Sequence, residues 1–405
     1  MNRIELCSGV IPPIVFEVRP TALVAELAGP AGATGTKAER LVAAAISTPL
    51  DGPPLATHAV PGDKVVIAVA GGLPQAGHVV AAVTAHLGDA GITDDSISIL
   101  HAGPTAAGLD AATEFHAAAV AETSYLAADK AGHPLHMARR LVDADVVVAV
   151  GEWSFDARLG GRSLGGELWP AFGRAECDAD LNVDLARRGR GALRRWRANL
   201  QAVVWQLGVM ACLRVVAGCQ GSLAAAAFGT AAAAARQARV AATAWSPAVA
   251  KSAELAVCSL SQTRSGFNAV ARAVAAAARI TRPGGTICVV AGSTEPPGPV
   301  VTRWREGTPL EPLVREALRS GDQSLVADAV EARFLARGLG DHRLVLLSNL
   351  DEALVEDLGF GHAASPDAVH RLVRRAESVV IIHEADLMFP RLPSRDRLED
   401  AASPA

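Results

Sequence analysis

The 405-residue sequence predicts an α/β protein, with two α/β domains whose mostly parallel sheets are flanked by helices. Short β-branched apolar runs alternate with stretches of helical spacing, which is the pattern of parallel strands joined by crossover helices. The pattern restarts near Pro247, and a chain of this length has room for two domains. We expect domains over 1–248 and 249–392, followed by a polar, disordered tail over 393–405.

The first half begins with three predicted strands and two predicted helices. The strands are the apolar runs at 65–70, 96–100 and 145–150, and the helices cover 79–87 and 110–128. The carboxyl ends of parallel strands share one edge of a sheet, where ligands commonly bind. The loops that follow these strands, at 70–77, 101–108 and 151–170, are therefore the expected ligand-binding segments.

Two further segments precede the restart of the pattern. An alanine-rich stretch at 223–244 predicts a helix. Six arginines and Trp196 lie within 187–197, and only four lysines occur in the whole chain. Most positive charges of this protein are thus arginines, so an arginine-rich segment does not by itself indicate a binding site. We favour a solvated helix face for 187–197 over a patch that binds anions or nucleic acid.

The second half repeats the alternation of strands and helices. Its predicted strands are 254–259, 285–291, 343–348 and 378–383, and its predicted helices are 266–280, 309–336 and 365–376.

Composition excludes several classes of protein. The 38 basic and 42 acidic side chains give a net charge of −4, which argues against nucleic acid as a partner. The most apolar stretch is interrupted by Gln206, Arg214 and Gln220, so no membrane span is expected. The six cysteines have no metal-finger spacing, and the first residues lack the pattern of a signal peptide. We expect a cytoplasmic protein without a metal site; its oligomeric state stays open.

The short motifs are weak. The loop at 70–77 is neither a dinucleotide-binding fingerprint nor a phosphate-binding loop. His133 and His136 could share a helix face, but Pro134 between them disfavours metal binding there. His101 ends a predicted strand and either faces a cleft or belongs to the core.

Five segments give the chain a resemblance to the nickel-dependent lactate racemase (LarA) family. They lie in the family's order at 45–55, 61–67, 91–100, 144–151 and 283–291. The resemblance implies two α/β domains with a cleft between them. It also implies a nickel pincer nucleotide tethered to a lysine, and two histidines that act as bases while hydride passes between a 2-hydroxy acid and the cofactor.

The chain departs from the family at the positions that carry this chemistry. By alignment, Thr105 and Asp156 stand where the catalytic histidines belong, and Gly166 stands in place of the cofactor-bearing lysine. Asn182 falls where a nickel-ligand histidine would be, and Arg272 replaces an active-site lysine. No lysine occurs between Lys130 and Lys251, and no histidine between His136 and His342. We therefore predict no cofactor, and no nickel pincer nucleotide in particular.

Two interpretations remain open. In the first, the protein lacks the family's chemistry and binds a small anionic ligand, or a partner, in the interdomain cleft. Its expected ligand-binding residues are Thr105, Arg162, Gly165, Gly166, Asn182, Arg264 and Arg272. In the second, the protein is a divergent isomerase, a racemase or epimerase of a 2-hydroxy acid. Its catalytic candidates are Asp156, His101 and Glu167.

Overall fold

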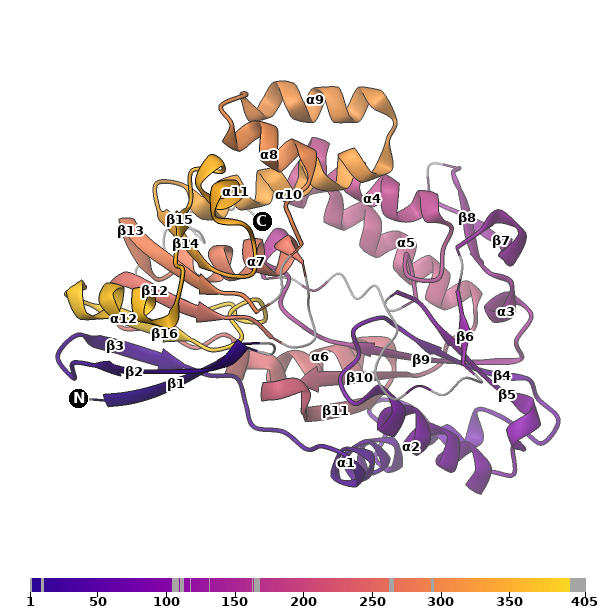
Figure 1. Cartoon of the computed structure of the whole chain (residues 1–405). Coiled ribbons are helices and arrows are strands. Elements are labelled where there is room, and N and C mark those ends of the chain that lie inside the picture. Colours follow the sequence, from indigo (N-terminus) through magenta and orange to yellow (C-terminus); the bar gives the residue numbers. More distant parts are fainter. Residues whose placement is uncertain are drawn as a thin grey trace. The chain divides into compact units, whose positions relative to one another are not determined.

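The chain forms two compact units. The computed structural model describes residues 2–8, 11–103, 109, 113–116, 118–130, 132–161, 163, 168–261, 266–292 and 295–393 (Figure 1). One unit is Pro30–Thr243, and the other joins Met1–Gly29 to Ala244–Ala405. This division differs from the expected domain over 1–248 at both ends, since residues 1–29 and 244–248 belong to the other unit. At the beginning of the chain, strand β3 (Leu23–Leu27) pairs in parallel with β16 (Val379–Ile382). Residues 394–405 of the expected tail lie outside the described residues.

The Pro30–Thr243 unit is built on a six-stranded sheet in the order β11-β10-β9-β4-β5-β6. Its strands are β4 (Val65–Val69), β5 (Ile97–His101), β6 (Glu114–Phe115), β9 (Val146–Glu152), β10 (Cys212–Ala217) and β11 (Leu223–Gly229). Neighbouring strands are parallel except for β10 and β11. The three strands expected from the sequence in this region are confirmed, and they form the centre of the sheet.

Successive residues of β10 point to opposite faces of this sheet. Leu213 and Val215 enter one apolar core together with α1 (Thr36–Ser47) and α2 (Ala76–Asp89). Cys212 enters the core of the other face. Trp196 and Val203 of α5 (Leu193–Gln206) belong to the same core as Cys212. Arg214, two residues from Cys212, therefore lies on the α5 face.

The remaining elements of this unit are α3 (Arg139–Val142), α4 (Ala175–Arg188), α6 (Ala231–Ala241) and the antiparallel pair β7 (Thr123–Ala128) and β8 (Pro134–Ala138). Helix α6 contacts β10 and β11.

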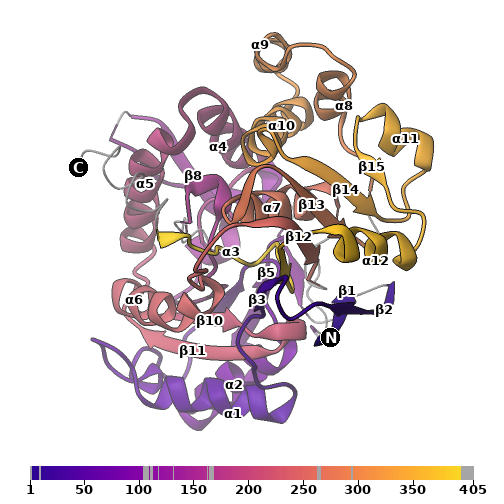
Figure 2. The same cartoon turned by 90° about the vertical axis from the view of Figure 1, so that its left-hand side faces the viewer.

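The second unit contains a six-stranded parallel sheet in the order β15-β14-β13-β12-β16-β3. Besides β3 and β16, its strands are β12 (Ala253–Ser259), β13 (Thr281–Val290), β14 (Arg343–Leu347) and β15 (Gly361–His362). Its helices are α7 (Phe267–Ala278), α8 (Pro299–Arg305), α9 (Leu310–Ser320), α10 (Gln323–Leu339), α11 (Glu352–Asp357) and α12 (Pro366–Arg375). The hairpin of β1 (Asn2–Ser8) and β2 (Ile11–Val18) shares an apolar core with β12, β13 and α12. Figure 2 shows the hairpin beside α12.

Three helix predictions are corrected. The stretch 110–128 contains β6 and β7 where it is described, because β7 pairs with β8, which buries Leu135 and Met137. The first part of 223–244 is strand β11, since pairing with β10 overrides the helix propensity of its alanines. The stretch 309–336 is two helices, because Gly321 takes a positive φ of 71° at the end of α9.

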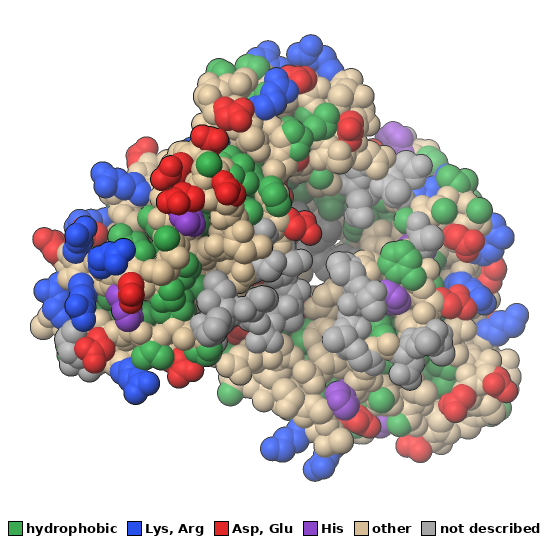
Figure 3. Space-filling model, in the orientation of Figure 1, with side chains coloured by type: hydrophobic (Ala, Val, Ile, Leu, Met, Phe, Trp, Pro, Cys, Tyr) green, Lys and Arg blue, Asp and Glu red, His purple; other side chains and the backbone are tan. Residues whose placement is uncertain are grey.

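The face drawn in Figure 3 carries charged side chains of both signs. Acidic and basic side chains are interspersed there among the coloured residues. Among the described residues, no helix has the length and apolar character needed to cross a membrane.

Candidate functional site

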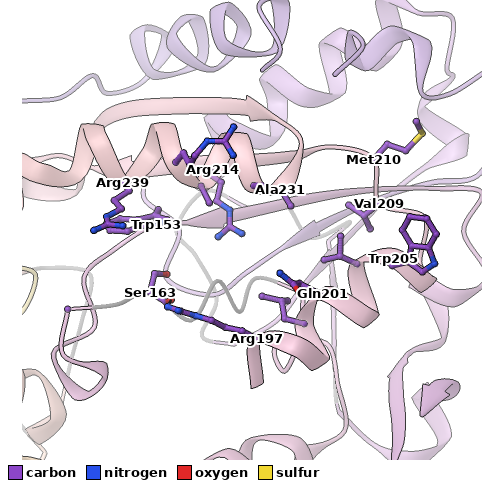
Figure 4. Close-up of a pocket in the computed structure, with 17 residues that line it drawn as sticks. Trp153, Ser163, Arg197, Gln201, Trp205, Val209, Met210, Arg214, Ala231 and Arg239 are labelled. Carbon is purple, nitrogen blue, oxygen red and sulfur yellow. Dashed lines mark hydrogen bonds between the residues drawn. The ribbon is translucent and has the colours of Figure 1, made fainter. Parts of the chain in front are cut away.

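A cavity of about 1030 Å³ lies within the Pro30–Thr243 unit. Its walls come from α5, α6 and the turn after α5, with Arg214 of β10 between them. Trp153, just after β9, and Gly161 and Ser163 of the following loop complete the described lining (Figure 4). We call it the arginine cavity, after its four arginines Arg197, Arg214, Arg236 and Arg239.

One face of α5 forms the first wall. Its lining residues are Arg197, Leu200, Gln201, Val204 and Trp205. These positions are spaced i, i+3, i+4, i+7 and i+8, which places them on a single helix face. The cationic residue is at the beginning of this stripe, and the large apolar residues are at its end.

One face of α6 forms the second wall, with Ala231, Ala232 and Ala235 followed by Arg236 and Arg239. Thr230 caps the helix, its side-chain oxygen accepting a hydrogen bond from the backbone N–H of Ala233 at 3.3 Å. The small alanine side chains leave space at the beginning of this wall. The two arginines bring positive charge to its end.

Arg214 is the buried cation of the cavity. It is 4% exposed, although it belongs to a strand whose other residues are apolar. Strand β10 is held beside β9, where Arg214 pairs with Gly151 in the parallel register and the Trp153 N–H donates to the Val215 carbonyl at 2.8 Å. Burying a guanidinium is costly unless the surroundings compensate its charge. A sheet strand therefore fixes one positive charge at the cavity wall.

All charged side chains in the described lining of the cavity are arginines. None of its described lining residues is Asp or Glu. Arg197 donates to the Ser163 carbonyl at 3.0 Å, and Arg236 pairs with exposed Asp51 at 2.8 Å. Figure 4 shows Arg197 extending from α5 toward Ser163, with Arg239 on the α6 wall and Arg214 on β10 between the two walls. This arrangement suits a negatively charged group.

A buried network holds α5 in position. The Asp184 carboxylate of α4 accepts hydrogen bonds from Trp196 Nε1 at 2.8 Å and from Arg195 Nη1 at 3.2 Å. Arg195 also lies 3.6 Å from the Asp129 carboxylate. The Trp196 ring stacks on Trp169 with 4.6 Å between centroids. The segment 187–197 is thus more than a solvated helix face. Arg195 pairs with the carboxylates of Asp129 and Asp184, and Arg197 lines the cavity.

Two of the catalytic candidates follow strands of the sheet in this unit. His101 ends β5, is 7% exposed, and has its ring centroid 5.2 Å from that of Phe115. Asp156 is half-buried after β9, where its carbonyl accepts hydrogen bonds from the N–H groups of Leu159 and Gly161. Strand β4 separates their two strands. Neither side chain lines the arginine cavity.

The remaining candidates are less informative. Asn182 is half-buried on α4. Arg272 belongs to α7 of the other unit, and its Nε donates to Asn268 Oδ1 at 3.1 Å. The candidates outside the described residues are Thr105, Arg162, Gly165, Gly166, Glu167 and Arg264.

None of the four arginines of the cavity is among the ligand-binding residues expected from the sequence, although Arg197 lies in the arginine-rich segment 187–197. Arg214 is the easiest of them to identify in the sequence, because it interrupts a short apolar strand pattern. An arginine at such a position is either exposed at the edge of a sheet or buried with a specific role. Arg236 and Arg239 are three residues apart, which predicts a shared helix face, but their position beside β10 comes from the fold alone.

A lysine-tethered nickel cofactor does not fit the residues present. The 120 positions between Lys130 and Lys251 contain no lysine, and Asn182 offers a neutral amide in place of an imidazole ligand. A neutral amide is a poor ligand for nickel compared with imidazole.

Comparison with known proteins rests on structure. No family model matches the chain, and no curated protein matches it either. The lactate racemase apoprotein from Thermoanaerobacterium thermosaccharolyticum is similar in structure, with a TM-score of 0.76, 17% identity, and coverage of 96% of this chain and 100% of that one. A Thermotoga maritima protein solved by a structural genomics consortium has a TM-score of 0.62 and 11% identity, covering 88% and 98%. The chain therefore has the α/β fold of the lactate racemase apoprotein, as the resemblance in its sequence implies.

Proposed function

We propose that this chain is a divergent member of the lactate racemase family that binds a small anion in the arginine cavity, without the family's nickel-dependent hydride transfer. The observation that carries the proposal is the cavity lining, in which four arginines and no described carboxylate surround one space. The proposal keeps the anionic ligand expected from the sequence and changes its location. Of the arginines expected to bind it, Arg162 lies in sequence between the lining residues Gly161 and Ser163.

The ligand group that best suits this lining is a carboxylate or a phosphate. A guanidinium presents paired N–H donors in a plane, and both groups accept two such hydrogen bonds at once. Arg214 is held by a sheet strand, so it needs little reordering when an anion arrives. Arg239, exposed on α6, has no carboxylate partner among the described residues and can turn toward the same anion.

The absence of the family's chemistry is supported by the donor set. A tether requires a lysine, and the segment that would supply it has none. A racemase that transfers hydride to either face of a planar keto acid also needs bases on both sides of the substrate. The aligned positions Thr105 and Asp156 offer a hydroxyl and a carboxylate in place of two imidazoles.

The alternative function, a divergent 2-hydroxy acid isomerase, needs an acid–base pair at the ligand. His101 and Asp156 would have to reach one substrate, yet neither lines the cavity. No observation among the described residues favours this alternative over anion binding.

The anion-binding proposal can be tested by calorimetric titration with inorganic phosphate and with short carboxylates, including both lactate enantiomers. We expect saturable binding that Arg214→Met weakens about tenfold or more, since a hydrogen bond to a charged group is worth roughly 1.5–3 kcal/mol. Methionine is a long side chain that tolerates burial. The control is Arg319→Met, an exposed arginine of α9 in the other unit. Absence of binding by every anion, or equal affinity in Arg214→Met, would overturn the proposal.

The catalytic part needs a separate test. The protein would be purified from cells that make the nickel pincer nucleotide, and its intact mass and nickel content measured. We expect the mass of the unmodified chain without stoichiometric nickel. A covalent adduct with one nickel per chain would contradict the proposal, and racemisation of 2-hydroxy acids would then be assayed.

A further inference from the structure

The two ends of the arginine cavity differ in chemistry. Figure 4 shows Arg197, Arg214 and Arg239 together with Ser163 at one end, and Trp205, Val209 and Met210 at the other. Gln201 lies between the two groups, and it is the polar side chain nearest the apolar end among the labelled residues. The cavity is thus polarised along its length.

The two helices that form the walls explain this polarity. On α5, Arg197 and Trp205 are eight residues apart, which separates them by roughly 12 Å along the helix axis. On α6, alanines come first and the arginines come last. The first turns of α5 and the last turns of α6 therefore supply the cationic end. A ligand that touches both ends must be considerably longer than lactate or phosphate.

The apolar end exposes large side chains to solvent. Trp205 is 81% exposed and Met210 is 61% exposed, and both line the cavity. Val209 and Val204 lie beside them in the lining and are largely shielded from solvent. Apolar side chains gathered at the rim of a cavity typically mark a binding site, because covering them removes apolar area from water.

We propose that the ligand is an amphipathic anion, with a carboxylate or phosphate head at the arginines and a hydrocarbon body that extends toward Trp205 and Met210. This inference rests on the proposed function and adds the chemical class of the ligand. A hydrocarbon body suits the apolar end better than a nucleobase, because the labelled residues at that end offer aliphatic and aromatic surface and only one polar group, the indole N–H of Trp205, for the edge of a base.

The test is a chain-length series. Acetate, butyrate, hexanoate, octanoate and decanoate are titrated calorimetrically into the full chain, and octyl phosphate is compared with octanoate to identify the preferred head group. Each added methylene that reaches the apolar end should tighten binding about fourfold, the equivalent of about 0.8 kcal/mol. A nucleoside monophosphate is included as the competing ligand class.

Variants assign the effect to the two ends. Trp205→Ala and Met210→Ser should weaken octanoate at least fivefold and leave acetate unchanged, whereas Arg214→Met should weaken both acids. Val240→Ala is the matched control, since Val240 is 64% exposed on α6 and does not line the cavity. Equal affinity for acetate and octanoate, or tighter binding of the nucleotide, would overturn this inference while anion binding stands. If no anion binds, the proposed function fails with it.

Discussion

Asp184→Ala should destabilise the Pro30–Thr243 unit and loosen the α5 wall of the arginine cavity. Asp184 is 8% exposed, and its carboxylate accepts the indole N–H of Trp196 at 2.8 Å. Trp196 is 2% exposed, so the substitution leaves a buried donor without this acceptor. Arg195 loses one carboxylate but stays 3.6 Å from Asp129.

The size of the effect follows from these contacts. A buried hydrogen bond to a charged acceptor contributes roughly 1.5–3 kcal/mol. The Arg195 side chain is 38% exposed, so its ion pair with Asp184 adds less than about 1 kcal/mol. We expect the free energy of unfolding to fall by about 3 kcal/mol. With an m-value of about 2.5 kcal/mol per molar urea, the midpoint would decrease by about 1 M.

The assay is urea unfolding followed by tryptophan fluorescence, together with a double-mutant cycle. Trp196→Phe removes the donor, so the double variant should be more stable than the sum of single effects predicts, by about 1–2 kcal/mol. Asp89→Ala, at an exposed position of α2, is the control and should change stability by less than about 0.5 kcal/mol. Additive effects of Asp184→Ala and Trp196→Phe would refute this account of how α5 is held.

Three further predictions concern other parts of the fold. Gly229→Ala should cost about 3 kcal/mol in the same urea assay, because Gly229 has a φ of 149° and an added Cβ would overlap the backbone of Leu50; an unchanged midpoint would contradict this. Burial raises the pKa of the Cys288 thiol to about 12, so peptide mass mapping should find Cys288 unmodified by a thiol reagent at about pH 8 in the native chain and modified after unfolding. Burial also raises the pKa of the Asp328 carboxyl. The native state then holds this proton more tightly than the unfolded chain, so the contribution of Asp328 is largest below its ordinary pKa near 4 and falls as pH rises through the raised value. The stability of the wild type relative to Asp328→Asn should therefore decrease between about pH 3 and pH 7, and a constant difference would refute the shift.

The sequence predicts the central strands well and the edges poorly. The β-branched runs of β4 and β9 are buried on both sides, so their composition reports directly on their place in a parallel sheet. Strand β11 is the opposite case, because its four alanines favour a helix in isolation and its pairing with β10 decides the outcome. Strand β3 joins a sheet whose other strands begin more than 200 residues later, and no local pattern reports that pairing.

The candidate site likewise has features that the sequence indicates and features that only the fold reveals. Local pattern identifies the arginine-rich segment 187–197, but it does not distinguish Arg195, which bridges two buried carboxylates, from Arg197, which lines the cavity. Arg214 interrupts an apolar strand, and that interruption is visible in the sequence. The position of Arg214 beside α6 depends on the antiparallel pairing of β10 with β11. The alanine-rich composition of β11 favours a helix, so the sequence does not indicate this pairing.

The measurement that tests the central claim most directly is a crystal structure of the full chain grown with octanoate. The account predicts density for the ligand in the arginine cavity, with its carboxylate at Arg214 and Arg239 and its chain extending toward Trp205. A cavity without ligand at saturating octanoate, or octanoate bound only elsewhere on the chain, would contradict it.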